Sequence, residues 1–156
     1  MLRQTINQPR ILLVEDNPLD VALTRRVFSR QGTEIPITHA GDGLEAVDLL
    51  RSGTGPLPTL ILLDLNLPKM DGIEVLKEIR GDPKLGHIPV IMLTTSGRAE
   101  DVLRSYAAGA NAYIIKPVDL AEFQKVMDTV RLFWTEMVTL PDATLTQGDF
   151  DRRRRA

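Results

Sequence analysis

Hydrophobic residues alternate between two patterns along this chain. Short, unbroken apolar runs are separated by longer stretches in which apolar residues recur every three or four positions. The runs are typical of strands buried on both faces, and the longer stretches are typical of amphipathic helices. The expected strands cover residues 10–14, 60–63, 89–93 and 112–115, and also residues 35–40, where Thr38 and His39 interrupt the apolar run.

Helix-start signals follow each of these runs. Asn17 suits an N-cap and Pro18 suits the first helical position, so a helix is expected from Pro18 to about Arg30. Further helices are expected from Gly43, from Asp71, over Ala99–Ala108, and from Asp119 to about Val138. Because strands and helices alternate through short connections, the prediction is an α/β fold: a five-stranded parallel, doubly wound sheet with five helices on its two faces.

Composition narrows the class of protein. The chain has 156 residues, of which 43% are hydrophobic and 26% charged, as in an ordinary globular domain. A net charge of −2 gives no reason to expect affinity for nucleic acid or for an acidic membrane. The lack of cysteine excludes disulfides and Cys-ligated zinc, and two histidines, His39 and His87, are too few for a multi-His metal site.

Three segments are expected along the chain. Residues 1–9 form an N-terminal extension without the apolar core of a signal peptide, and residues 10–138 form the domain. Residues 139–156 form a C-terminal extension that lacks periodicity and ends in an arginine run, Arg152–Arg155, expected to be a solvated tail. No apolar run approaches the ~18 residues of a membrane span, so a cytoplasmic protein is expected.

Polar residues follow the expected strands where each strand ends. Glu15 and Asp16 follow the first strand, Asp64 the third, Thr94 the fourth and Lys116 the fifth. The carboxyl ends of parallel strands meet at one edge of the sheet, so these side chains are expected to converge. Clustered carboxylates repel one another, and a hard cation such as Mg²⁺ relieves the repulsion. The set predicts a site for a phosphoryl group carried on an aspartate, with Mg²⁺ and the lysine stabilising the transferring oxygens.

These residues, in this order, resemble the response-regulator receiver domain of two-component signalling. The likeness extends from about Arg10 to Val138 and also rests on residues 66–68, 71–72, 108–110 and 113–117. The resemblance implies the flavodoxin-like strand order 2-1-3-4-5. It implies that Asp64 accepts phosphate from a sensor histidine kinase, and that the protein is a stoichiometric phosphoacceptor with at most slow self-dephosphorylation rather than an enzyme.

Roles for individual residues follow from the same resemblance. It implies Mg²⁺ on Asp16, on Asp64 and on the backbone carbonyl of Asn66, with Glu15 acting through water. It also implies that Thr94 and Tyr113 reorient as a switch when the aspartate is phosphorylated, and that the bond between Lys116 and Pro117 is often cis. On residue type alone, Tyr113 could simply pack in a strand, the acidic pair could be helix-start anions, and Thr95 could be confused with Thr94.

A narrower likeness concerns the stand-alone response regulators of bacterial phytochromes. It rests on residues 93–96 and 116–120 and on Phe133–Trp134 before residues 140–141. This resemblance implies no output domain and an extended, dimer-forming last helix. Phe133 and Trp134 point about 100° apart on a helix and are not expected to face one core. Together with Met137 they form a candidate interface.

The expected output is therefore a contact. A homodimer or a partner protein would bind at the face formed by the fourth helix, the fifth strand and the fifth helix. One departure from the family concerns Thr95, which stands where many receivers have a very small residue and could narrow access to the phosphoryl group.

Two other functions stay open. A haloacid-dehalogenase-like phosphatase would need a second aspartate two residues after Asp64, where this chain has Asn66, a poor proton carrier. A scaffold that binds its partner without phosphorylation is the other alternative. The intact acidic pair, with Asp64, Thr94 and Lys116, argues against it.

Overall fold

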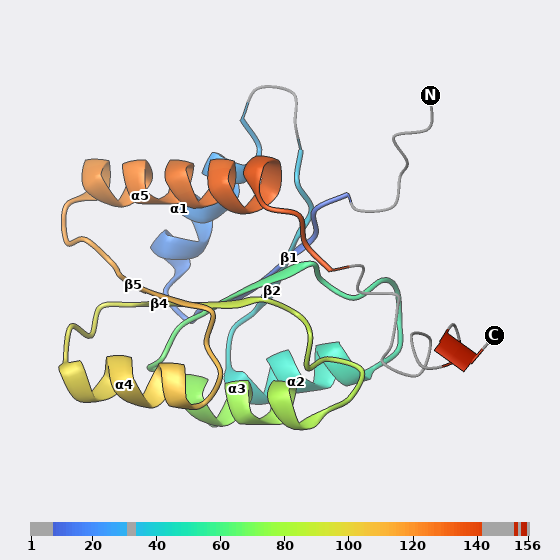
Figure 1. The fold of residues 1–156 in the computed structure, drawn as a ribbon. Coiled ribbons are helices and arrows are strands. Elements are labelled where there is room, and N and C mark those ends of the chain that lie inside the picture. Colours follow the sequence, from blue (N-terminus) through green and yellow to red (C-terminus); the bar gives the residue numbers. More distant parts are fainter. Residues whose placement is uncertain (1–7, 31–33, 142–151, 153, 156) are drawn as a thin grey trace.

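The computed structural model describes residues 8–30, 34–141, 152, 154 and 155. Both expected extensions lie largely outside these residues, as does Arg153 of the arginine run. Strands and helices alternate through the described chain (Figure 1). In order they are β1 (Ile11–Val14), α1 (Pro18–Phe28), β2 (Ile37–Ala40), α2 (Gly43–Arg51), β3 (Leu60–Leu63), α3 (Gly72–Gly81), β4 (Val90–Thr94), α4 (Ala99–Ala107), β5 (Ala112–Ile115), α5 (Leu120–Leu132) and a π-helical turn, η2 (Phe133–Met137).

The strands form one parallel sheet in the order β2-β1-β3-β4-β5, which confirms the predicted α/β fold. Its register aligns the strand ends. Val14 pairs with Leu63, so the residues that follow β1 and β3 emerge side by side. Thr94 pairs with Ile115, so the end of β4 lies beside the end of β5.

Helices cover both faces of the sheet. Figure 1 shows α1 and α5 on one face and α2, α3 and α4 on the other. Alternate strand residues divide between two buried clusters, as the period-two geometry of a strand requires. Those packed with α2 and α3 include Leu12, Val14, Ile61 and Leu63, and those packed with α1 and α5 include Ile11, Leu13, Leu60 and Leu62.

Most elements differ by at most two residues from their sequence-based bounds, and two of the differences have a physical cause that the structure shows. The second strand begins at Ile37 rather than at residue 35, because Pro36 has no N–H to donate to the sheet. The last α-helix ends at Leu132 rather than near residue 138, and a π-helical turn replaces its final part. In that turn the Thr135 hydroxyl donates to the Arg131 carbonyl, which competes with the backbone N–H that would otherwise bond there.

Arg80, near the end of α3, forms hydrogen bonds to two loops at the amino-terminal ends of β4 and β5, opposite the carboxyl edge of the sheet. Its Nε donates to Gly109 O at 2.9 Å, and Nη1 donates to Gly86 O at 3.1 Å and to Ile88 O at 2.8 Å. Its Nη2 donates to Asn111 Oδ1 at 2.8 Å. Burial lowers the pKa of Arg80 from its ordinary value, but the guanidinium remains charged. One side chain thus joins the α3–β4 and α4–β5 loops.

Candidate functional site

Three predicted acidic residues meet at the carboxyl edge of the sheet. Asp64 follows β3, and its backbone N–H donates to Val14 O at 3.0 Å, which places it next to the end of β1. One carboxylate oxygen each from Glu15, Asp16 and Asp64 lies within 4.8 Å of the others. Glu15 is 2% exposed and Asp64 8%, whereas Asp16 is exposed. These hard oxygen donors fit a divalent cation of the Mg²⁺ type.

Lys116 reaches into the same cluster from the end of β5. The residue is 6% exposed, and its Nζ donates to Glu15 Oε2, to Asp64 Oδ2 at 3.2 Å and to Asp20 Oδ2 at 3.1 Å. The sequence predicts that Glu15 and Asp64 lie near Lys116, but it does not identify Asp20 as a member of the site. A signal for it existed: α1 begins directly after β1, so its first turn must lie at this edge of the sheet.

Burial shifts the pKa values of Glu15 and Lys116, which are hydrogen-bonded to each other. Desolvation raises the pKa of Glu15 to about 7, the hydrogen bond from Lys116 opposes that rise, and the charge of Asp64 adds to it. Burial by itself would lower the pKa of Lys116, but the hydrogen bond to Glu15 and the charge of Asp64 outweigh burial, so the pKa is raised. The ammonium is therefore charged at neutral pH, and it faces more negative charge than it can balance.

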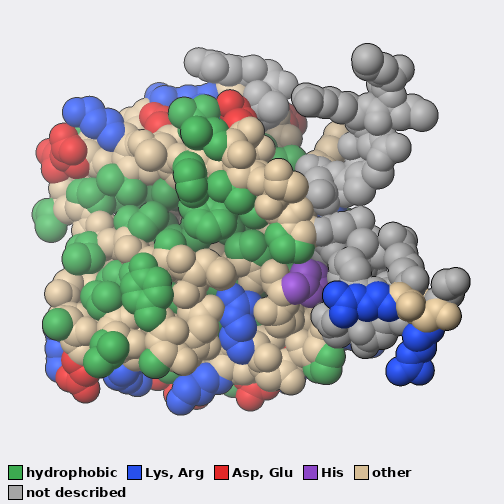
Figure 2. All heavy atoms as spheres, in the orientation of Figure 1, with side chains coloured by type: hydrophobic (Ala, Val, Ile, Leu, Met, Phe, Trp, Pro, Cys, Tyr) green, Lys and Arg blue, Asp and Glu red, His purple; other side chains and the backbone are tan. Residues whose placement is uncertain are grey.

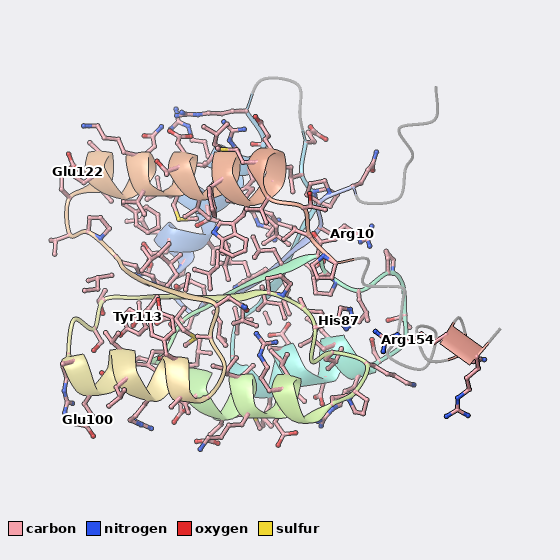
Figure 3. The ribbon with its side chains drawn as sticks, viewed as in Figure 1. Arg10, His87, Glu100, Tyr113, Glu122 and Arg154 are labelled. Carbon is pink, nitrogen blue, oxygen red and sulfur yellow. The ribbon has the colours of Figure 1, made fainter. Side chains whose placement is uncertain are left out.

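The predicted switch residues, Thr94 and Tyr113, share one partner, Ser96. Thr94 is fully buried, and its Oγ1 accepts from the Ser96 N–H at 3.4 Å. The Tyr113 hydroxyl donates to Ser96 O at 2.8 Å, and burial raises the pKa of this tyrosine. Figure 3 shows Tyr113 on the side of the sheet that faces α4. Ser96 Oγ donates to Asp101 Oδ2, which ties the β4–α4 loop to α4. Neither Ser96 nor Asp101 was identified from the sequence.

Other predicted residues surround this centre. The Asn66 N–H donates to Asp64 Oδ1 at 3.3 Å, whereas the role of its carbonyl stays a prediction. Thr95 is exposed at the surface. The bond between Lys116 and Pro117 is trans, whereas the resemblance implied a bond that is often cis.

Gly72 fixes the backbone behind Asp64. Its N–H donates to Leu65 O at 2.8 Å. A β-carbon on this glycine would lie 2.2 Å from Asp64 O and 2.8 Å from Leu65 Cα, far inside ordinary contact. The start of α3 can therefore approach the site this closely only because the residue is glycine.

The three candidate interface residues in η2 lie in different environments. Phe133 is 46% exposed and Met137 67% exposed. Trp134 instead packs against the buried cluster under α1 and α5, with its ring edge-to-face on Phe133 at a centroid distance of 5.5 Å. The expectation that the two aromatic rings do not share one core agrees with this arrangement.

Comparison with known proteins identifies the family. The response regulator receiver domain matches residues 11–128. The chain belongs to this family. The chain is 43% identical over 142 residues to response regulator Rcp1 of Synechocystis, a match that covers 88% of this chain and 97% of Rcp1.

Solved structures agree with this assignment. The Mn²⁺-bound form of Rcp1 has a TM-score of 0.82 at 42% identity and covers 85% of this chain and 99% of Rcp1. The phosphorylated cyanobacterial phytochrome response regulator RcpA has a TM-score of 0.83 at 38% identity, with coverage of 86% and 99%. The bacteriophytochrome response regulator AtBRR has a TM-score of 0.63 at 40% identity, with coverage of 85% and 99%.

These findings confirm a receiver domain similar to phytochrome-associated stand-alone regulators. Receiver domains are generally phosphoacceptors rather than enzymes, and they bind a divalent metal at their acidic pocket. In the part of the receiver domain that the structure describes, no helix has both the length and the apolar character needed to cross a bilayer.

Proposed function

We propose that this protein accepts a phosphoryl group on Asp64 from a sensor histidine kinase, and that the kinase is a bacterial phytochrome. The observation that carries the proposal is the Lys116 ammonium 3.2 Å from Asp64 Oδ2, beside the carboxylates of Glu15 and Asp16. The likeness to RcpA, a phytochrome response regulator solved in phosphorylated form, supports both parts of it.

In phosphoryl transfer to Asp64, the protein mainly positions the reacting groups and stabilises charge. An Asp64 carboxylate oxygen forms a bond to phosphorus while the bond from phosphorus to the donor's imidazole nitrogen breaks, and that nitrogen keeps the electron pair. Lys116 stabilises the negative charge on the transferred oxygens. Thr94, whose hydroxyl now accepts from Ser96, can turn to donate to the phosphoryl group.

A magnesium ion would be held by Asp16, by Asp64 and by the backbone carbonyl of Asn66, with Glu15 acting through water. When bound it would neutralise charge on the transferring oxygens. The cluster of carboxylate oxygens supports this assignment. Glu15 and Asp64 are buried, and the single positive charge of Lys116 does not balance the negative charge of the cluster.

The output would be a contact at the face formed by α4, β5 and α5. Figure 2 shows hydrophobic side chains gathered across this face. The exposed large hydrophobic residues on these elements and on the loop between β5 and α5 are Leu103, Tyr106, Ile115, Val118, Leu120 and Leu132. Phosphorylation would act on this face through Thr94, Ser96 and Tyr113, because all three are joined by hydrogen bonds beside α4.

We propose that a homodimer, with Phe133 and Met137 at its edge, is the contact that phosphorylation changes. The protein would act in the cytoplasm without binding nucleic acid or membrane, and it would lose its phosphate only slowly by itself.

Intact mass after incubation with acetyl phosphate and Mg²⁺ tests the proposal, with size-exclusion chromatography alongside. Wild type should gain one phosphoryl group, and Asp64→Asn should gain none. Asp48→Asn, which changes an exposed aspartate on α2, is the matched control and should behave as wild type. A wild type that takes up no phosphate from acetyl phosphate or from a phytochrome kinase would overturn the proposal, and an unchanged elution volume on phosphorylation would overturn its dimer part.

A further inference from the structure

All three N–H donors of the Lys116 ammonium have a carboxylate as acceptor. An ammonium has three N–H donors, and the structure gives Nζ three acceptors, on Glu15, Asp20 and Asp64. Two of these acceptors belong to residues that also form the cation cluster. The third does not, because the cluster comprises Glu15, Asp16 and Asp64 alone among the described residues.

Asp20 is held in place by its own helix. It lies in the first turn of α1, where its N–H donates to Asn17 Oδ1 at 3.4 Å and its carbonyl accepts from the Thr24 hydroxyl at 2.7 Å. Its side chain is 19% exposed, so the contact with Lys116 is largely shielded from water. The carboxylate is thus a partner of Lys116 that stands on a well-anchored backbone and does not belong to the cation cluster.

From these contacts we infer that Asp20 is a positioning residue for phosphoryl transfer, an inference that rests on the proposed function. Glu15 and Asp64 would also hold a bound cation, and their hydrogen bonds to Lys116 would then weaken. Asp20, which is outside the cluster, would keep the ammonium beside Asp64. When the phosphoryl group arrives, Lys116 exchanges its bond to Asp64 for one to a phosphoryl oxygen and turns about its bond to Asp20.

A simpler role for Asp20 would be to stabilise the start of α1, since an acidic side chain in a first turn interacts favourably with the helix dipole. Glu74 has that role in α3, where it is exposed and contacts no buried cation among the residues that the structure describes. The two roles differ in what they affect. A helix-start role changes the free energy of unfolding, whereas a positioning role changes the rate of phosphorylation at saturating Mg²⁺.

The first experiment compares phosphorylation rates with acetyl phosphate at saturating Mg²⁺. Asp20→Ala should react roughly ten- to a hundredfold more slowly than wild type, because Lys116 is no longer held in place. Asp20→Asn keeps an oxygen that accepts from Nζ and should retain most of the rate. Glu74→Ala should react as wild type. A wild-type rate in Asp20→Ala, or equal losses in Asp20→Ala and Asp20→Asn, would overturn the inference.

A double-mutant cycle provides the second test. If Asp20 acts only through Lys116, then Asp20→Ala should slow the reaction in wild type but not in the Lys116→Met background. The same loss in both backgrounds would show that Asp20 acts independently, and the inference would fail. Failure of the proposed function is distinct, because wild type itself would then take up no phosphate. Circular dichroism on each variant confirms that it is folded. If Asp20→Ala does not fold, Asp20→Ser takes its place, because serine removes the carboxylate but suits the start of a helix.

Discussion

Replacing Gly72 with alanine should damage both stability and phosphorylation. The new methyl group would lie 2.2 Å from Asp64 O and 3.0 Å from Asp64 C, and ordinary contact begins only at 3.4 Å. The atoms in the way are backbone, so no rotamer change relieves the overlap. Either the start of α3 or the segment after β3 must move by more than 1 Å.

The size of the effect follows from that displacement. Overpacking a buried site typically costs about 1–3 kcal/mol, and a clash with backbone belongs at the upper end, near 3 kcal/mol. Because the segment that moves carries Asp64, a shift of about 1 Å should also slow phosphorylation on the order of a hundredfold. Denaturant unfolding with an unchanged m-value gives the first quantity, and intact mass over time gives the second.

Gly81 is the matched control, since it ends the same helix and a β-carbon there would meet nothing within 4 Å. Gly81→Ala should be neutral or stabilising by up to about 1 kcal/mol, because alanine loses less backbone entropy on folding. If Gly72→Ala lost less than about 0.5 kcal/mol and took up phosphate at the wild-type rate, the close approach of α3 would not determine the geometry of the site.

Two further predictions concern single hydrogen bonds. Tyr113→Phe removes the bond to Ser96 O and should cost about 1 kcal/mol in denaturant unfolding while phosphate uptake stays at the wild-type rate; slower uptake would contradict a role confined to the switch. The hydrogen bond from the Glu45 N–H is the main cause of the lowered pKa of Asp42, the N-cap of α2. The charge of Asp42 therefore stabilises the protein when the pH is above the ordinary pKa near 3.8, and this stabilisation is lost as the pH falls through the lowered pKa. Asp42→Asn keeps the cap without the charge, so the stability gap between wild type and this variant should close on acidification, as thermal unfolding across pH would show; a constant gap would refute it.

Four of the five strands were predictable because each carries an unbroken apolar run and ends in polar residues, whereas β2 contains Thr38 and His39. The parallel topology followed from the short connections, which placed Glu15, Asp64 and Lys116 at one edge. The sequence was therefore enough to predict that the acidic pair and the lysine lie close together, because their proximity depends on the order of the strands rather than on any single rotamer.

The parts that escaped prediction depend on how far side chains reach. Asp20 resembles any acidic residue in a first helical turn, and only the length and direction of Lys116 make it a partner. Ser96 lies in a loop, where no periodicity marks a contact with Thr94 or Tyr113. The π-helical turn was also missed, because apolar spacing in α5 continues through it unchanged.

The hydrogen bonds of Arg80 limit which loops of this protein can be exchanged or lengthened independently. Its guanidinium bonds to Gly86 and Ile88 in one loop and to Gly109 and Asn111 in another. The three donors of a lysine, all on one nitrogen, could not reach four acceptors spread over two loops. A loop exchanged with a homologue, or lengthened by insertion, would break bonds to the other loop as well. The α3–β4 and α4–β5 loops should therefore be transplanted together or not at all.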